Sequence, residues 1–165
     1  MKSLTFRYSI TQFTYWATIR RHALLLATFL LSAPLFALTE GNFTYEVSND
    51  KATITSFSDS FSGNLSIPST LGGHRVTKIG EGAFFECSAL TSVEIPASVT
   101  KIDWGAFYGC SSLTSVEIPA SVTSIGSMAF SGCSSLTSVV IPKGVTKIGE
   151  GVFLFCSDLL KIHRQ

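Results

Sequence analysis

The four cysteines of the chain have side chains that could bind a metal, form disulfides or act as nucleophiles. Cys87, Cys110, Cys133 and Cys156 recur every 23 residues, so a chain that coils once per interval would place them in a column with steps of ~4.8 Å. Four sulfurs in a line cannot converge on one zinc ion at ~2.3 Å. Disulfides between neighbouring cysteines are an alternative that the spacing allows, because the Cα atoms would lie within the ~4.4–6.8 Å that a disulfide requires. We favour the simpler interpretation, in which buried thiols act as small hydrophobic residues.

A pair of glutamates is the second candidate for chemistry. Glu94 and Glu117 occupy equivalent positions one interval apart and would stack ~5 Å from each other, as a carboxylate pair or a calcium site would require. The next member of this column is Val140, which favours a solvated polar face instead. Since no C-x-x-C motif and no purposefully placed histidine accompanies the cysteines, we predict no catalytic residue, no metal and no cofactor. The chain is not expected to be an enzyme.

Residues that could bind a partner fall into two groups. The first is a repeated serine and glutamate pattern on one strand face, and the second is a set of aromatic residues in columns that vary from unit to unit. Aromatic side chains are enriched at the energetic centres of protein interfaces, although these could instead cover neighbouring turns. The candidate partner-binding residues are Trp104, Tyr108 and Phe85 in the variable columns, and Ser92, Glu94, Ser115, Glu117 and Ser138 on the strand face.

An internal repeat positions all of these residues. Residues 87–109, 110–132 and 133–155 are consecutive units, preceded by a related unit at 64–86 and followed by a partial one at 156–165. The first two of these three agree at 17 of 23 positions. Such a period is the signature of a solenoid, in which stacked units share one continuous core.

The apolar spacing within one unit predicts its local structure. Val93 and Ile95 alternate with polar residues, as in a strand, and Pro96 ends the strand because it has no N–H to donate. Ile102 and Ala106 step by four toward the next cysteine, which predicts a helical or 3₁₀ turn. One unit buries too little to fold alone, since eight side chains contribute ~16 kcal/mol against at least ~23 kcal/mol of backbone entropy. The units must therefore stack.

The residues before the repeats suggest export and a cap. Residues 1–37 contain four basic residues and no acid, and they end in the apolar run 23–37, the pattern of a secretory signal peptide. Residues 38–63 contain two alternating segments separated by Asn49 and Asp50, which predicts an N-terminal β cap. The remaining chain has 8 basic and 11 acidic residues, so a nucleic-acid partner is not expected.

The pattern L-x-x-V-x-I-P followed by V-T-x-I-x-x-x-A-F-x-x-C resembles the BspA-like leucine-rich repeats, and the resemblance covers residues 43–165. It implies a right-handed solenoid. Together with the spacing and the stacking described above, we predict a short α/β repeat solenoid with a parallel β-sheet, 3₁₀ or turn segments and an N-terminal β cap. The resemblance also implies secretion or surface display and adhesion or protein binding, with the export segment as the contact with the membrane. The alternative is a self-associating structural protein, or a fragment of a longer array, because the last turn around Leu159 and Ile162 carries no recognisable cap.

Overall fold

A computed structural model describes residues 37–165. The predicted signal peptide therefore lies outside the described residues, apart from Ala37. Within the described part of the chain, no helix has the length and apolarity that a membrane span requires.

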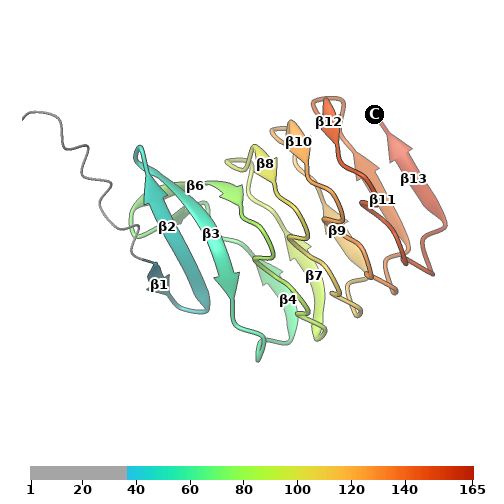
Figure 1. Ribbon diagram of the computed structural model, residues 1–165, viewed down its shortest axis with the longest axis horizontal. Helices are drawn as coiled ribbons and strands as arrows, with labels where there is room; N and C mark the ends of the chain where they lie inside the picture. Colours follow the sequence, from blue (N-terminus) through green and yellow to red (C-terminus); the bar gives the residue numbers. More distant parts are fainter. Residues whose placement is uncertain (1–36) are drawn as a thin grey trace, which may run out of the picture. The chain divides into compact units, whose positions relative to one another are not determined.

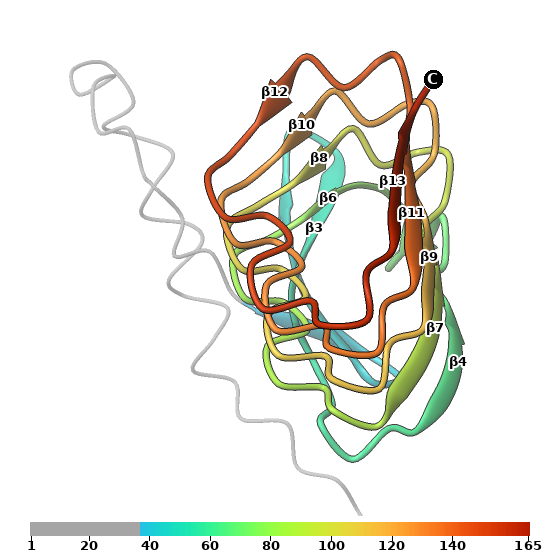
Figure 2. The ribbon, with the colours of Figure 1, turned by 90° about the vertical axis from the view of Figure 1, so that its right-hand side faces the viewer.

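The described chain coils into a solenoid whose turns have three sides (Figures 1 and 2). Two sides are sheets, one of eight strands and one of five, in which strands from successive coils are parallel neighbours. The eight-stranded sheet contains β1 (Leu38–Glu40), β2 (Phe43–Ser48), β3 (Lys51–Phe57), β5 (Thr70–Leu71), β6 (His74–Ile79), β8 (Lys101–Ile102), β10 (Ser124–Ile125) and β12 (Lys147–Ile148). The five-stranded sheet contains β4 (Gly63–Ser66), β7 (Leu90–Glu94), β9 (Ser115–Glu117), β11 (Ser138–Ile141) and β13 (Lys161–Arg164).

The third side of each coil, called here the turn arm, consists of residues 81–86, 104–109, 127–132 and 150–155. The sequence predicted 3₁₀ or turn segments here, and the structure has turns; the helical alternative is wrong, because none of the described residues is helical. Alternate N–H groups form hydrogen bonds to the next coil. The N–H of Phe107 donates to the carbonyl of Ala129 in the next coil at 2.8 Å, whereas the N–H of Tyr108 donates to the carbonyl of Gly105 in its own coil at 2.9 Å. A helix would keep these hydrogen bonds within one segment, and here half of them join successive coils instead.

The core is one continuous apolar column, as the repeat predicted. The rings of Phe84, Phe107, Phe130 and Phe153 stack in a row, with centroids 4.8, 5.1 and 5.8 Å apart and planes within 13° of parallel. Phe57 of β3 continues the row at 5.0 Å from Phe84, so the N-terminal strands share the same core. The solenoid prediction is thus confirmed by the side chains on which it depended.

The N-terminal end is closed by antiparallel strands. β1, β2 and β3 extend the eight-stranded sheet beyond β6, and the two predicted strands appear as β2 and β3. Between them Asn49 and Asp50 have positive φ angles of 50° and 61°, in agreement with the predicted turn. The segment around Gly72 and Gly73 is a β-hairpin of β5 and β6, because both glycines supply the positive φ that a tight two-residue turn needs.

Candidate functional site

The cysteine column belongs to the core. All four thiols are free, and the Sγ atoms of Cys110 and Cys133 donate to the carbonyls of Phe84 and Phe107, each at 3.2 Å. Burial raises the pKa of Cys133 to about 12, with a further contribution from Cys156 and a partial offset from its backbone hydrogen bond. Burial also raises the pKa of Cys110 and, more modestly, those of Cys87 and Cys156. A thiol must ionise to act as a nucleophile, so this column is suited to packing.

The main charged cluster of the described residues supports the fold. Asp103 bridges Lys78 and Lys101, with Nζ–Oδ distances of 2.5 and 2.7 Å. Burial alone would raise the pKa of Asp103, but the hydrogen bonds from Lys101 and Lys78 outweigh it and the pKa is lowered. Residues 37–165 contain no group of three or more His, Cys, Asp or Glu side chains that could hold a metal ion.

The strand face of the five-stranded sheet carries the serines and glutamates in the predicted register. Ser92 pairs with Ser115 and Glu94 with Glu117, and the glutamate column continues to Val140. Ser138 lies exposed on β11 in the same sheet. An open hollow of about 500 Å³ lies over β4, β7 and β9, and the hydroxyl of Ser66 donates to Glu94 at its rim over 3.1 Å. The face is polar and shallow.

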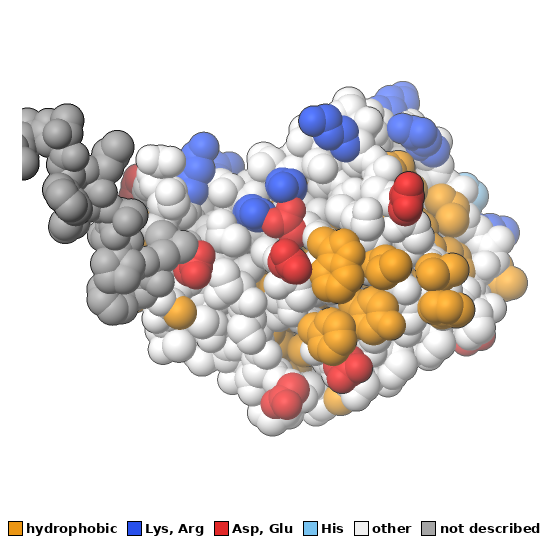
Figure 3. All heavy atoms as spheres, viewed as in Figure 1, with side chains coloured by type: hydrophobic (Ala, Val, Ile, Leu, Met, Phe, Trp, Pro, Cys, Tyr) orange, Lys and Arg blue, Asp and Glu red, His pale blue; other side chains and the backbone are white. Residues whose placement is uncertain are grey.

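The turn arm carries an apolar surface that contains the predicted aromatic residues. Phe85 and Trp104 are 47% and 45% exposed, while Tyr108 is half-buried and stacks on Phe85 with ring centroids 5.1 Å apart. Leu154 is also exposed, and its register places it in the column of Phe85 and Tyr108. Hydrophobic side chains gather on this side of the molecule (Figure 3). We call Phe85, Trp104, Tyr108, Met128 and Leu154 the turn-arm patch.

The structure adds Met128 to the residues proposed from sequence. Met128 has a φ of 56°, whereas glycine fills the equivalent positions 82, 105 and 151. Its side chain lies beside Leu154, since a Cβ built on Gly151 would meet Met128 Cγ at 3.7 Å and Leu154 Cβ at 3.6 Å. The signal in the sequence was a bulky residue in a glycine column. Ser131, by contrast, belongs to the column of Tyr108 but is buried, so that column is not uniformly exposed.

The two predicted groups do not form one site. The strand-face residues lie on the five-stranded sheet, and the aromatic residues lie on the turn arm, which are different sides of each coil (Figure 2). A partner that contacts one side through a compact surface would leave the other side free.

Comparisons with known proteins agree with this architecture. The model of the BspA type leucine rich repeat region matches residues 53–165, in six copies. A leucine-rich repeat protein from Bacteroides capillosus has 31% identity and a TM-score of 0.70, with 78% of this chain and 98% of that chain covered. A leucine rich cell surface protein from Faecalibacterium prausnitzii has 32% identity and a TM-score of 0.63, with 79% of this chain covered. The chain spans 43% of that second protein.

Solved structures with lower sequence identity resemble this chain in fold alone. The pneumococcal vaccine antigen PcpA has a TM-score of 0.63 at 22% identity, with 79% of this chain and 38% of that chain covered. No curated protein matches the chain. The match to the repeat model, over more than half of the sequence, shows that this chain belongs to the BspA-type leucine-rich repeat family.

Proposed function

We propose that this chain is a secreted or surface-displayed protein-binding module without catalytic activity, and that the turn-arm patch is its contact surface. The observation that carries the proposal is the exposure of Phe85 and Trp104 on the outer surface of the turn arm, where Tyr108 stacks on Phe85. Exposed aromatic residues cost free energy in water, and clusters of them mark interaction sites.

The charges around the turn-arm patch indicate the chemistry of its partner. Glu81 and Glu150 are exposed in the same column as Trp104, and Glu86 is exposed next to Phe85. Figure 3 shows acidic side chains around the hydrophobic group. We therefore expect a polypeptide partner that presents apolar side chains flanked by lysine or arginine, since opposite charge favours both encounter and register.

The conformation of Met128 supports the same surface. A bulky residue in the left-handed region costs roughly 1–2 kcal/mol, and glycine avoids that cost in the neighbouring coils. The cost would be offset in a complex, because methionine adapts its shape to apolar partners. Backbone strain of this kind is concentrated at functional sites.

Two observations support surface display. The apolar run at residues 23–37 follows a basic segment without acids, and one relative with 32% identity is a cell surface protein. Adhesion is the specific role that we propose for such a surface module.

The proposal can be tested with phage-displayed random 12-residue peptides selected on the purified chain. We expect enriched peptides to combine aromatic or aliphatic residues with lysine or arginine, and to lose at least tenfold in affinity with the double variant Trp104→Ala and Tyr108→Ala. The matched control is the double variant Ser115→Ala and Glu117→Gln on the strand face, which should bind normally. Thermal unfolding would verify that both variants fold.

The reverse result would overturn the assignment of the surface. Peptides that ignore the aromatic variant but are lost with the strand-face variant would move the contact to the hollow over β4, β7 and β9. Selected peptides that bind both variants with unchanged affinity would remove the turn-arm patch as a binding site.

A further inference from the structure

The β-hairpin of β5 and β6 is an insertion that the repeat does not require. Val76 follows Pro68 by eight positions, whereas Val99 follows Pro96 by only three, so the hairpin adds five residues to its coil. β3 occupies one edge of β6, and β5 lies along the other edge, which faces the next coil. The hairpin therefore separates the start of β6 from residues 97–98, which the repeat would otherwise place beside it.

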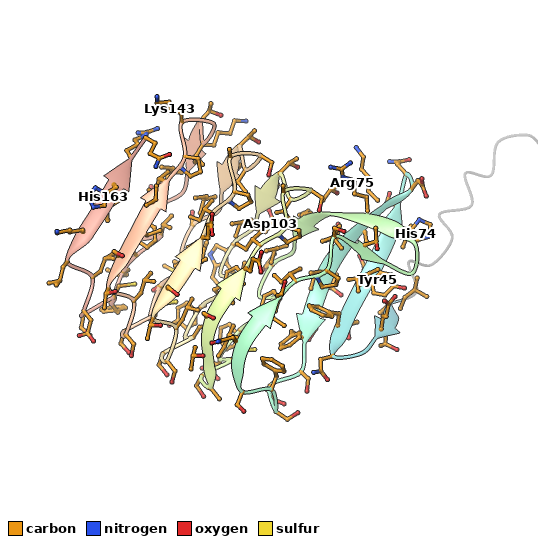
Figure 4. All side chains as sticks on the ribbon, turned by 180° about the vertical axis from the view of Figure 1, so that it is seen from behind. Tyr45, His74, Arg75, Asp103, Lys143 and His163 are labelled. Atoms are coloured by element: carbon orange, nitrogen blue, oxygen red, sulfur yellow. The ribbon has the colours of Figure 1, made fainter. Side chains whose placement is uncertain are left out.

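An open hollow of about 490 Å³, called here the hairpin hollow, lies between this hairpin, the turn that joins β2 to β3, and residues 97–98. His74 joins two of its walls, since Nδ1 of its ring lies 2.7 Å from Oδ1 of Asp50 in the β2–β3 turn. Figure 4 shows His74 and Arg75 on the hairpin. Five of the seven lining residues have polar side chains, so the hairpin hollow has the size for one small ligand and favours a polar one.

A buried hydroxyl group without a partner belongs to the hairpin hollow. Ser98 lines it and is 7% exposed, and its Oγ atom has no hydrogen-bond partner among residues 37–165. In the next coil the equivalent Ser121 donates to the carbonyl of Val99 at 2.7 Å. The corresponding acceptor for Ser98 would be the carbonyl of Val76, to which it does not donate. Buried hydroxyl groups are normally bonded, and rotation about χ1 of Ser98 would let it donate to a ligand.

Arg75 supplies a positive charge to the hairpin hollow. It is exposed and lines the hollow, and it forms no ion pair with any residue between 37 and 165. Lys51 pairs with Arg75 in the sheet and is also exposed, so a second positive charge lies on the same face. A guanidinium binds a carboxylate through two parallel hydrogen bonds. The hairpin hollow is therefore suited to a ligand with a carboxylate.

Asp50 and three hydroxyl groups restrict the rest of the ligand. Oδ1 of Asp50 is bound to His74, and the side chain is 90% exposed, so Oδ2 can accept a hydrogen bond from a ligand. The hydroxyls of Ser69, Thr70 and Ser98 can each donate or accept. A second negative group on the ligand would be repelled by Asp50, and an ammonium group could not accept from the hydroxyls. Ligand hydroxyl groups both donate and accept, so they match this lining.

We propose that the hairpin hollow binds an acidic sugar, a monosaccharide unit with one carboxylate and several hydroxyl groups. The guanidinium of Arg75 binds the carboxylate, Asp50 accepts from one sugar hydroxyl, and Ser98 donates to another. This site lies beside the eight-stranded sheet, away from the turn-arm patch, and it does not depend on the proposed protein-binding function.

The probe is methyl β-D-glucuronide, and the control is methyl β-D-glucoside, which has the same ring without the carboxylate. NMR titration of the full isotope-labelled chain should show saturable shifts of the amides of Gly73, Arg75 and Ser98 with the glucuronide. The glucoside should bind about tenfold more weakly, because it lacks the charge-assisted pair with Arg75. Equal binding of the two sugars, or no saturable shift with the glucuronide, would overturn the proposal. So would acetate that binds as tightly as the glucuronide, because the hydroxyl groups would then contribute nothing.

Two pairs of variants separate binding from a structural role. Arg75→Gln should weaken the glucuronide about tenfold, whereas Lys147→Gln, with the same change of charge in the same sheet, should not. Ser98→Ala should weaken it about threefold without lowering the thermal unfolding midpoint, because the lost hydroxyl has no partner in the described chain. Its control Ser121→Ala should lower the midpoint through the lost bond to Val99 and leave binding unchanged. Equal losses of affinity at Arg75 and Lys147, or a Ser98→Ala variant that loses stability but not affinity, would contradict the assigned site.

Discussion

Removal of one ring from the phenylalanine row tests the stacking on which the whole fold depends. Phe107 is fully buried, and its ring lies between Phe84 and Phe130 at centroid distances of 4.8 and 5.1 Å. We expect Phe107→Ala to lower the free energy of unfolding by about 3–5 kcal/mol, because the cavity that remains loses contacts on both sides. Of this, the two aromatic contacts contribute roughly 0.5–1.5 kcal/mol each.

The position of a ring in the row sets the size of its effect. Phe153 is half-buried and stacks on one ring only, Phe130, at 5.8 Å. Phe153→Ala should therefore cost about half as much as Phe107→Ala, roughly 1.5–2.5 kcal/mol. Ser115→Ala, on the exposed strand face, should change the free energy of unfolding by less than about 0.5 kcal/mol.

Urea unfolding followed by far-ultraviolet circular dichroism measures all three variants. The slope of the free energy against urea must be compared as well, since a solenoid can lose its end coils separately. If Phe107→Ala leaves too little folded protein, Phe107→Leu retains most of the volume and should cost roughly 1–2 kcal/mol. Equal losses at Phe107 and Ser115, or a larger loss at Phe153 than at Phe107, would refute the assignment of inward and outward positions.

Four further predictions concern contacts between coils. Gly126→Ala should lower the thermal unfolding midpoint, with a loss of at least about 1–3 kcal/mol, because its Cβ would lie 2.5 Å from backbone atoms of Asp103 and Trp104; an unchanged midpoint would contradict that close approach. Folding lowers the pKa of Asp103, so its ion pairs stabilise the folded chain when the pH is above 3.8, the ordinary pKa of the group. This contribution is lost as the pH falls through the lowered pKa of the folded state. The stability difference between the wild type and Asp103→Asn should then shrink in urea titrations below about pH 4, and a constant difference would argue against the ion pairs. Met128→Gly should raise stability by about 0.5–1 kcal/mol while weakening selected peptides, and a destabilised variant would show that no strain is stored there. Cys133 should react with a thiol reagent at pH 8 only after urea unfolds the protein, and rapid labelling of the native chain would exclude a buried thiol.

The period of the sequence predicts most of the architecture. Once the 23-residue register is known, parallel stacking determines which residues face each other, so the pairing of Ser92 with Ser115 and of Glu94 with Glu117 could be read in advance. The row of phenylalanines follows from the same register. Each prediction needed only the alignment of one unit on the next.

The turn arm could not be predicted in this way. The steps of four from Ile102 to Ala106 to Cys110 occur both in a helix and in a series of turns. The two structures differ in which carbonyl accepts the hydrogen bond from the N–H of Phe107. The acceptor is a carbonyl in another coil, and the local sequence pattern contains no information about that coil. The partial exposure of Met128 and the burial of Ser131 cannot be read from a local pattern either, because equivalent positions in other coils carry residues of different size.

Comparison of the units with each other separates structural residues from candidate binding residues. Threonines recur beside the sheets because their hydroxyls hold the coils together: Thr114 Oγ1 donates to the carbonyl of Thr91 at 3.0 Å, and Thr123 Oγ1 to that of Thr100 at 3.2 Å. A residue with such a role must repeat in every coil. In the column of Trp104 the hydroxyl of Ser127 accepts from the N–H of Glu150 at 3.2 Å, but that contact does not recur at Trp104, so the side chain in this column can differ between coils without disturbing the stack. In this solenoid, repetition therefore marks what the fold requires, and the columns that vary are where specificity for a partner can be built.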